Sequence, residues 1–206
     1  MLRRFLLGIM VVSLASLAWA GVPDLTLSTA SIDPAANGAS VYVIPNGQGV
    51  GFDEAFLGGN QVDATITLTL VDSDTNPIFG YPFEDLWLGT TADGLVACPG
   101  GTTADGSTDE LGQTEWQNPL RAGGSSAGEA TLVYVAGTAL AGGGIDLTYN
   151  SADLNGDLQV NLSDVVPFTQ DLTGGTNPYR SDFNNDGVVN LSDIVRFTPA
   201  VGAICQ

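Results

Sequence analysis

No histidine and no lysine occur in this chain of 206 residues, and its five basic residues are all arginines. The absence of histidine excludes a Ser-His-Asp triad, a Cys-His pair and an imidazole zinc site. The absence of lysine excludes a Schiff base and the lysine of a P-loop. With 23 acidic residues and a formal net charge of −18, the chain lacks the cations that displace counterions from phosphates, so we expect no nucleic-acid partner. The arginines are Arg3, Arg4, Arg121, Arg180 and Arg196.

Aspartate, in contrast, is abundant: the sequence has 18 Asp and five Glu, together with 27 Gly. Asp, Asn and Gly favour turns, and carboxylate and amide oxygens are the ligands that hard cations such as Ca²⁺ prefer. The composition therefore indicates turns and divalent cations before any motif is considered.

Residues 1–20 have the pattern of a targeting segment. Two arginines are followed by an apolar run over 5–17 and by the small-residue site Ala18-Trp19-Ala20. This pattern predicts a cleaved secretory signal peptide. The alternative, an uncleaved membrane anchor, needs about 20 apolar residues, which is more than the run offers. We therefore expect a secreted, extracellular or cell-surface chain of residues 21–206, with no membrane span after cleavage and a net charge of −18 − 2 = −20.

The two cysteines of the chain are Cys98 and Cys205. An even number of cysteines in a secreted protein favours a disulfide. Chain-entropy theory gives the closure of a loop of about 100 residues a stabilisation of about 4–5 kcal/mol. The alternative is a pair of free thiols.

Residues 21–150 contain short alternating runs separated by Gly, Pro, Asn and Asp, and no window has helical spacing. In the clearest run, 62–70, apolar residues occupy the even positions and polar residues most of the odd ones. A period of two is typical of a strand with one buried face. Seven or eight such strands in about 130 residues predict a mainly β chain with an antiparallel β-sandwich. The other runs are 24–28, 40–44, 83–88, 95–98, 114–117, 130–136 and 145–149.

Two stretches within residues 60–120 resemble bacterial Ig-like domains of the invasin type. Residues 67–80 (TLTLVDSDTNPIFG) are similar to a hairpin of that family, and residues 104–114 (ADGSTDELGQT) are similar to the turn before a later strand. The resemblance implies that residues 21–150 form an Ig-like sandwich with a structural or adhesive role.

Residues 151–206 contain an internal duplication. Residues 153–164 (DLNGDLQVNLSD) and 182–193 (DFNNDGVVNLSD) are offset by 29, and 11 of 20 positions are identical between 153–172 and 182–201. Each unit matches a 12-residue calcium loop, in which alternate oxygen ligands converge on one ion. The alternative is a pair of solvated Asp/Asn turns.

We expect each loop to bind one Ca²⁺ through side chains at positions 1, 3, 5, 9 and 12 and a backbone carbonyl at position 7. Three carboxylates per loop give −3 against +2. The ligands of loop one are expected to be Asp153, Asn155, Asp157, the Gln159 carbonyl, Asn161 through water and Asp164. Those of loop two are Asp182, Asn184, Asp186, the Val188 carbonyl, Asn190 and Asp193.

The loops differ at position 6, where a positive φ is usually required. Loop two has Gly187 there, whereas loop one has Leu158. We therefore expect a strained or altered turn and a weaker site in loop one, and Gly156 at position 4 offers no evident compensation.

A helix-like run follows each loop, at 162–172 and 191–198. Val165, Val166 and Phe168 correspond to Ile194, Val195 and Phe197, so we expect the two helices to pack together across a pseudo-twofold axis. Pro167 is expected to kink the first helix or delay its start, and Pro199 to end the second.

Two such loops, each followed by one helix and with Asp at position 12, closely resemble a type I dockerin with its two F-hand loops. The resemblance implies a module that folds on calcium and binds a cohesin. Family members often carry Ser-Thr at the positions that contact the partner, where this chain has Leu162-Ser163 and Leu191-Ser192.

Two further sets of residues are candidate sites. The acidic pairs 53–54, 84–85 and 109–110 could be interpreted as glycosidase carboxylates, but adjacent acids in a strand point to opposite faces, so we favour solvated surface. Trp87, Trp116, Tyr81 and Tyr42 could form a sugar-stacking platform, although core packing is the role we expect for most of them.

These observations predict a secreted, non-catalytic structural or interaction protein. Its calcium-stabilised module would bind a cohesin-like module of another protein, or pack on its own sandwich or on copies of itself to build a surface layer or filament. The alternative is a carbohydrate-binding or scaffold component of an extracellular polysaccharide-degrading complex. An enzyme has no supporting set of residues.

Overall fold

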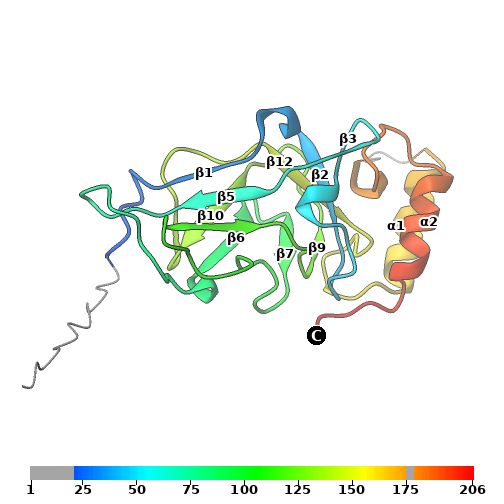
Figure 1. Ribbon diagram of the computed structural model, residues 1–206. Helices are drawn as coiled ribbons and strands as arrows, with labels where there is room; N and C mark the ends of the chain where they lie inside the picture. Colours follow the sequence, from blue (N-terminus) through cyan, green and yellow to red (C-terminus); the bar gives the residue numbers. More distant parts are fainter. Residues whose placement is uncertain (1–20, 175–178) are drawn as a thin grey trace, which may run out of the picture.

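The computed structural model describes residues 21–174 and 179–206; the predicted signal peptide lies outside the described residues. This part of the chain is mainly β, and two short α-helices lie side by side at one end (Figure 1). No helix in the described ranges has the length and hydropathy of a membrane span. The strands are β1 (Thr29–Ser31), β2 (Ala39–Val43), β3 (Ala55–Leu57), β4 (Asn60–Val62), β5 (Ile66–Thr69), β6 (Leu86–Thr90), β7 (Leu95–Ala97), β8 (Gln113–Trp116), β9 (Ala122–Gly124), β10 (Thr131–Val135), β11 (Thr138–Ala139) and β12 (Leu147–Ser151). The helices are α1 (Leu162–Leu172) and α2 (Leu191–Ala200), with short 3₁₀ turns η1 (Pro34–Ala36), η2 (Phe52–Glu54), η3 (Phe83–Asp85) and η4 (Tyr179–Ser181).

The strands form sheets with the orders β1-β5-β8, β11-β10-β6, β12-β2-β3-β4 and β7-β9. Their pairings are antiparallel, as predicted, except that β12 runs parallel to β2 with Leu147 opposite Ala39 and Ser151 opposite Val43. A fully antiparallel arrangement is therefore wrong at this pair. More than 100 residues separate the two strands in sequence, so no hairpin imposes an antiparallel direction on them.

The predicted period of two appears as alternating burial. Ala64, Ile66, Leu68 and Leu70 are all 0% exposed and belong to the main apolar core. Alternate residues of β6 and β10 enter the same core, so the sheets of β5 and of β6 and β10 share one interior. Burial of this apolar surface is the main stabilising contribution to the β part.

Two of the expected strands differ from the structure. Residues 24–28 form a turn before β1, because Asp24 Oδ1 accepts hydrogen bonds from the backbone N–H and the hydroxyl of Thr26. Such local side-chain bonds compete with a sheet ladder. The expected run 83–88 divides into η3 and β6, since it follows Pro82, which cannot donate to a ladder.

Both helices were located correctly from the sequence. The Phe168 and Phe197 rings stack with centroids 4.6 Å apart, which confirms that the helices pack together, whereas Val166 and Val195 are exposed. Pro167 lies inside α1 without delaying its start, and α2 continues through Pro199 to Ala200, so the expected end at Pro199 is wrong. Pro199 has no N–H to donate to the Val195 carbonyl, so α2 loses one hydrogen bond and ends one residue later, at Ala200.

The C-terminal residues share a second core with the β part. Tyr42 and Ile44, at the end of β2, pack with Phe168, Phe183 and Phe197. The Tyr42 and Phe183 rings lie 4.9 Å apart, and the Tyr42 hydroxyl donates to the Arg196 carbonyl. The predicted division after residue 150 thus falls within β12, and the helices pack directly on β2.

The predicted Cys98–Cys205 disulfide is confirmed. Its Cα atoms lie 5.7 Å apart, and it closes a separation of 107 residues. Beside it, Ile204 forms a β-bridge with Gln159 of loop one, and Arg121 donates to the Gln206 carbonyl at 2.8 Å. The chain's last residues are therefore held between loop one and the region after β7.

Removal of this disulfide should lower stability considerably. For a closed loop of this length we expect the Cys98→Ser/Cys205→Ser variant to lose about 4–5 kcal/mol of unfolding free energy. Urea unfolding followed by tryptophan fluorescence measures the loss. A reductant should destabilise the parent chain and leave the variant unchanged; equal midpoints for parent and variant would contradict the prediction.

Candidate metal centre

The two predicted loops begin with the same hydrogen-bond pattern. In loop one the Asp153 carboxylate accepts from the N–H of Asp157 at 3.1 Å and from the N–H of Leu158 at 2.8 Å. In loop two the Asp182 carboxylate accepts the two equivalent bonds at 3.0 and 2.7 Å. The chain therefore turns around the acid at position 1 in each loop.

The acids at position 12 close the loops and cap the helices. Asp164 accepts from the N–H of Leu154 and from the N–H of Asn161, each at 2.9 Å. Asp193 accepts in the same way from Phe183 at 2.8 Å and from Asn190 at 2.9 Å. Because each acid also completes a capping box, α1 and α2 begin where the loops end.

The residues at positions 3 and 5 contact each other in both loops. The Asn155 amide donates to Asp157 at 3.1 Å, and the Asn184 amide donates to Asp186 at 2.9 Å. The Asn184 Oδ1 atom is buried and has no hydrogen-bond partner. A buried amide oxygen without a donor is unfavourable, and it is a suitable ligand for a hard cation.

The predicted carbonyl and position 9 ligands also lie in these loops. The Val188 carbonyl accepts from the Asn190 amide at 3.2 Å. Gln159, whose carbonyl is the predicted ligand of loop one, forms a β-bridge with Ile204. The side-chain oxygens of Asn161 and Asn190 accept from the N–H groups of the serines two residues later, as helix N-caps. The position 9 oxygens are thus engaged in capping, so only a second lone pair or a water would reach an ion.

Burial and like charge disfavour ionisation of three loop acids, Asp153, Asp182 and Asp193. Asp153, Asp164 and Asp193 are 0% exposed and Asp182 is 4% exposed. Burial raises the pKa of Asp153 to about 6, and the negative charges of Asp164 and Asp157 act in the same direction. Burial likewise raises the pKa values of Asp182 and Asp193.

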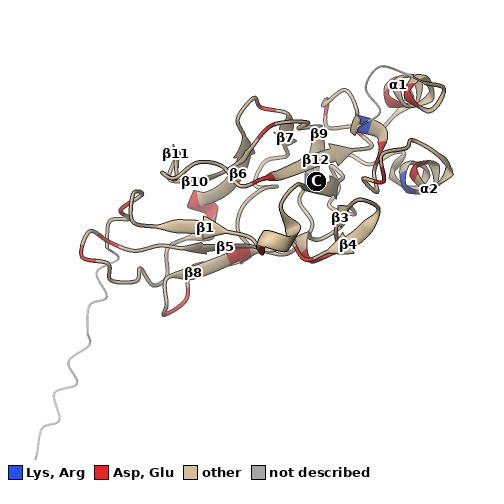
Figure 2. Ribbon diagram, turned by 90° about the horizontal axis from the view of Figure 1, so that it is seen from above, with Lys and Arg blue, Asp and Glu red and all other residues tan. Residues whose placement is uncertain are grey.

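The described residues supply little positive charge to balance these loops. Acidic segments are spread over the chain and include both loops beside the helices (Figure 2). The ion pair found among the described residues joins Arg180 to Asp171 at 2.6 Å and includes no loop acid. Within the same residues, no group of three or more carboxylate or thiolate side chains is placed so that it could hold a metal ion without other ligands. A cation here would need the amide and carbonyl oxygens as well, which is the mixed donor set that calcium accepts.

Of the two expected alternatives for the turn at Leu158, the strained one is found, since the leucine is left-handed, whereas the course of the turn is not altered. Leu158 has φ +66° and Gly187, at the same position 6, has φ +87°, so loop one follows the course of loop two. Position 4 is also left-handed in both loops, with Gly156 at φ +69° and Asn185 at φ +51°. Each loop therefore has one glycine for two left-handed positions. Of the two non-glycine residues, Leu158 is less favourable in the left-handed conformation than Asn185. The short polar side chain of an asparagine can form local hydrogen bonds that stabilise this conformation, and leucine cannot.

Two glycines of the β part support the loops, and sequence reasoning missed both. In β9, a Cβ on Gly123 would collide with the Asp153 carboxylate. In the turn between β3 and β4, a Cβ on Gly59 would lie 3.0 Å from the Asp186 Cβ, and the Gly59 N–H donates to the Asn185 carbonyl at 3.0 Å. Neither glycine lies near a loop in sequence, so no local pattern could indicate it.

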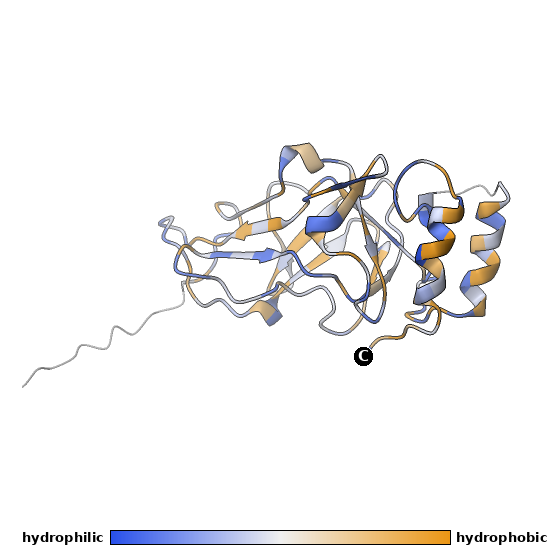
Figure 3. Cartoon of the chain, turned by 45° about the vertical axis from the view of Figure 1, so that its right-hand side comes forward, coloured by the Kyte–Doolittle hydropathy of each residue, from blue (hydrophilic) through white to orange (hydrophobic). Residues whose placement is uncertain are grey.

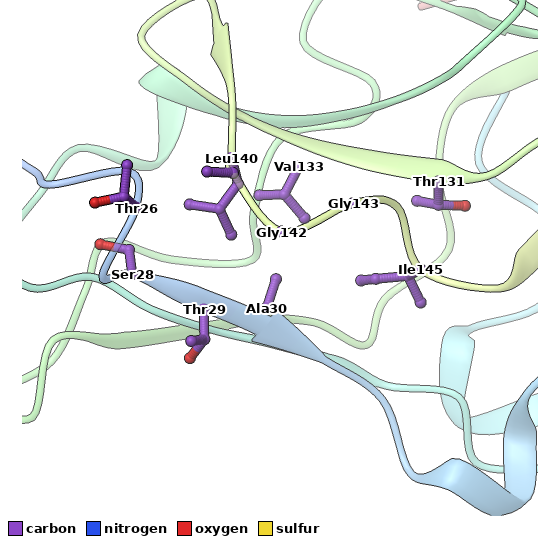
Figure 4. A pocket seen from close by; sticks show the side chains of 11 residues that line it. Thr26, Ser28, Thr29, Ala30, Thr131, Val133, Leu140, Gly142, Gly143 and Ile145 are labelled. Carbon is purple, nitrogen blue, oxygen red and sulfur yellow. The ribbon is translucent and has the colours of Figure 1, made fainter.

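Other parts of the molecule offer less to a ligand. A cavity of about 230 Å³ between β1 and the segment after β11 is lined by small hydroxyl and apolar residues, without a charged side chain (Figure 4). The acidic pairs 53–54, 84–85 and 109–110 are exposed, as predicted for solvated surface. Trp116 and Tyr42 are buried in the two cores, which confirms the packing role expected for them.

No family model matches the sequence, and no curated protein matches it. Among solved structures, a chain described as the crystal structure of the Lin-41 filamin domain aligns with 61% of this chain and 95% of its own, at 16% identity and a TM-score of 0.30. A TM-score below 0.5 does not establish a shared fold.

Exchanging residues at position 6 should change stability in opposite directions in the two loops. Leu158→Gly removes a left-handed leucine and should stabilise the chain by about 0.5–1 kcal/mol, whereas Gly187→Ala should destabilise it by about 1 kcal/mol. Nothing lies within 4 Å of a Cβ on Gly187, so this cost is conformational. Urea unfolding measures both, with Gly106→Ala, also in open space, as the control. The prediction fails if both loop variants shift stability the same way.

Proposed function

We propose that the chain is a secreted, non-catalytic structural or interaction protein whose C-terminal part binds two Ca²⁺ ions and mediates docking or self-assembly. The observation that carries the proposal is the matched pair of loops, each built around buried aspartates that share one hydrogen-bond pattern. We also retain the type I dockerin and Ig-like sandwich as the classes that the two parts of the chain resemble.

Electrostatics supports calcium as the cofactor. Each loop holds three carboxylates, two of them buried, and burial raises the pKa of the acid at position 1 in both. A divalent cation would offset the mutual repulsion of these acids and would supply the Asn184 oxygen with a partner. The proposed ligands are the twelve residues predicted from the sequence.

The packing favours a module that is part of its own chain's fold. The inner helix faces and Phe183 are buried against Tyr42, while Gly123 and Gly59 fit against the two loops. The Asn150 amide, at the end of β12, donates to the Asp182 carbonyl. An ion bound in either loop would therefore stabilise contacts with the β part as well as the helices.

The outer helix faces are available for a partner. Four apolar side chains, which we term the helix face, occupy equivalent positions of the two repeats and are exposed. Figure 3 shows hydrophobic segments along both helices. Exposed apolar residues grouped in this way are typical of an interaction surface. We propose that this face contacts a cohesin-like module or a second copy of the chain. Its residues are Leu162 (79% exposed), Val166 (59%), Leu191 (71%) and Val195 (66%).

Calcium should raise the melting temperature at pH 7. At a free calcium concentration about 100-fold above Kd, two sites would contribute about 5 kcal/mol, or about 10–20 °C for a chain of this size.

Lowering the pH to 5 should reduce this calcium-dependent rise in melting temperature. With its pKa raised to about 6, Asp153 binds a proton in the folded, metal-free chain more tightly than in the unfolded chain. Protons thus stabilise the metal-free fold below pH 6 and compete with calcium. Scanning calorimetry in calcium and in chelator checks both effects.

Two variants assign the calcium effect to the loops. Gly123→Ala should displace Asp153 and weaken the loop-one site about ten-fold or more, while leaving loop two titratable by calorimetry. Gly106→Ala serves as the matched control, because its Cβ meets nothing within 4 Å. Equal melting curves in calcium and chelator at pH 7 would refute the calcium proposal.

Polar substitution on the helix face should abolish association without unfolding the chain. Leu162 and Leu191 are largely exposed, so Leu162→Ser/Leu191→Ser should leave the calcium-dependent melting temperature within a few degrees of the parent. Light scattering of the calcium-loaded parent should show particles larger than a monomer, or a larger complex with an added cohesin module, and the double variant should show neither. Leu111→Ser, at a leucine that is 64% exposed outside the helices, is the control. If the calcium-loaded parent is a monomer and does not bind the cohesin module, this part of the proposal is wrong.

A further inference from the structure

The outer face of the β11-β10-β6 sheet carries a row of side chains unrelated to the calcium loops. Trp87 of β6 lies directly opposite Tyr134 of β10, and on its other side Trp87 forms a β-bridge with Thr103. The neighbours Leu86 and Leu88 point into the core and are at most 2% exposed. By alternation Trp87 and Tyr134 therefore face solvent, and both are partly exposed.

The Trp87 and Tyr134 rings stack on each other in a nearly parallel arrangement. Their planes differ by 7° and their centroids lie 5.7 Å apart, which is an offset arrangement that leaves part of each ring face uncovered. Tyr134 lies over Gly89, where a Cβ would sit 3.0 Å from the ring edge atom Cε2. The absence of a side chain at Gly89 thus leaves room for the edge of the tyrosine ring.

A hollow of about 300 Å³ adjoins the tryptophan end of this row. Trp87 forms one wall, the exposed Glu84 lies at its rim, and Thr102 and Thr103 contribute to the lining. The Thr103 hydroxyl donates to the Gly100 carbonyl at 3.2 Å and keeps its lone pairs free to accept. Polar acceptors thus border an aromatic surface on one side.

We infer that the row of Tyr134, Trp87 and Thr103, with Glu84 beside it, binds a neutral polysaccharide made of pyranose rings. The C–H face of a sugar ring packs on an aromatic face, and its ring hydroxyls donate to carboxylate and hydroxyl oxygens. A cross-strand aromatic pair also stabilises a sheet, but stabilisation alone requires no adjoining polar hollow.

Charge selects the class of ligand. The chain has a net charge of −18, and the acids Glu84 and Asp85 lie at this surface, so an anionic glycan would be repelled. The site involves none of the loop ligands or the helix face. Sugar binding therefore extends the proposed function, and the two proposals can be tested independently.

The test is titration calorimetry of the calcium-loaded mature chain with cellohexaose, xylohexaose, mannohexaose and maltohexaose, and with oligogalacturonate as the anionic comparison. We expect at least one neutral oligosaccharide to bind. Trp87→Ala and Tyr134→Ala should each weaken that binding about ten-fold or more, as expected for the loss of one aromatic platform. Trp87→Phe should retain most of it.

Two further variants keep the result interpretable. Glu84→Gln changes an exposed side chain without affecting the core, and it should weaken the same oligosaccharide measurably. Phe79→Ala removes an aromatic that is 58% exposed outside the row, and it should bind as the parent does. The Leu162→Ser/Leu191→Ser variant should also bind sugar normally.

Three results would overturn the inference. They are the absence of binding to every neutral oligosaccharide, binding that Trp87→Ala and Glu84→Gln both leave unchanged, and binding to oligogalacturonate alone.

Discussion

The constraint on which the C-terminal part depends is the burial of four aspartates, Asp153, Asp164, Asp182 and Asp193, each at most 4% exposed. A buried carboxylate is unfavourable unless hydrogen bonds or a cation compensate it. The chain meets part of this requirement with backbone N–H groups, which wrap each loop around its first acid and start each helix at its last. The remaining negative charge is what the proposed divalent cation would offset.

The loops in turn determine how the helices meet the β part. Each loop sets the start of its helix, and the Phe168 and Phe197 rings then stack over a core that includes Tyr42 of β2. Gly123 and Gly59 allow β9 and the β3–β4 turn to approach the loop acids. The Cys98–Cys205 disulfide holds the final residues against loop one. Loops, helices and sheet thus form one packed structure.

This arrangement leaves two kinds of surface exposed. The inner helix faces are used within the chain, so the apolar residues at the repeated outer positions remain free. The outer face of β6 and β10 presents two stacked aromatic rings beside acidic and hydroxyl groups. The helix surface is repeated because the loop-helix unit is duplicated. The aromatic surface results from the alternation of side chains along β6 and β10, whose other face fills the core.

Local patterns predicted much of the fold. The period of two at residues 62–70, the duplicated loops and the start of each helix depend on neighbouring residues, and all three appear where expected. The turn at 24–28 was misassigned because an Asp24 side-chain bond outweighed strand propensity. The expected end of α2 at Pro199 is wrong by one residue, because the proline removes one hydrogen bond without preventing Ala200 from completing the last turn.

The sequence by itself determined which residues are loop acids, which segments are helices and which two cysteines were available to pair. Only the tertiary structure decided that β12 lies parallel to β2, that Gly123 and Gly59 lie against the loops, and that Trp87 meets Tyr134. These contacts join residues far apart in the chain. Which residues meet in these contacts depends on how whole sheets pack, and no local period or motif in the sequence indicates that packing.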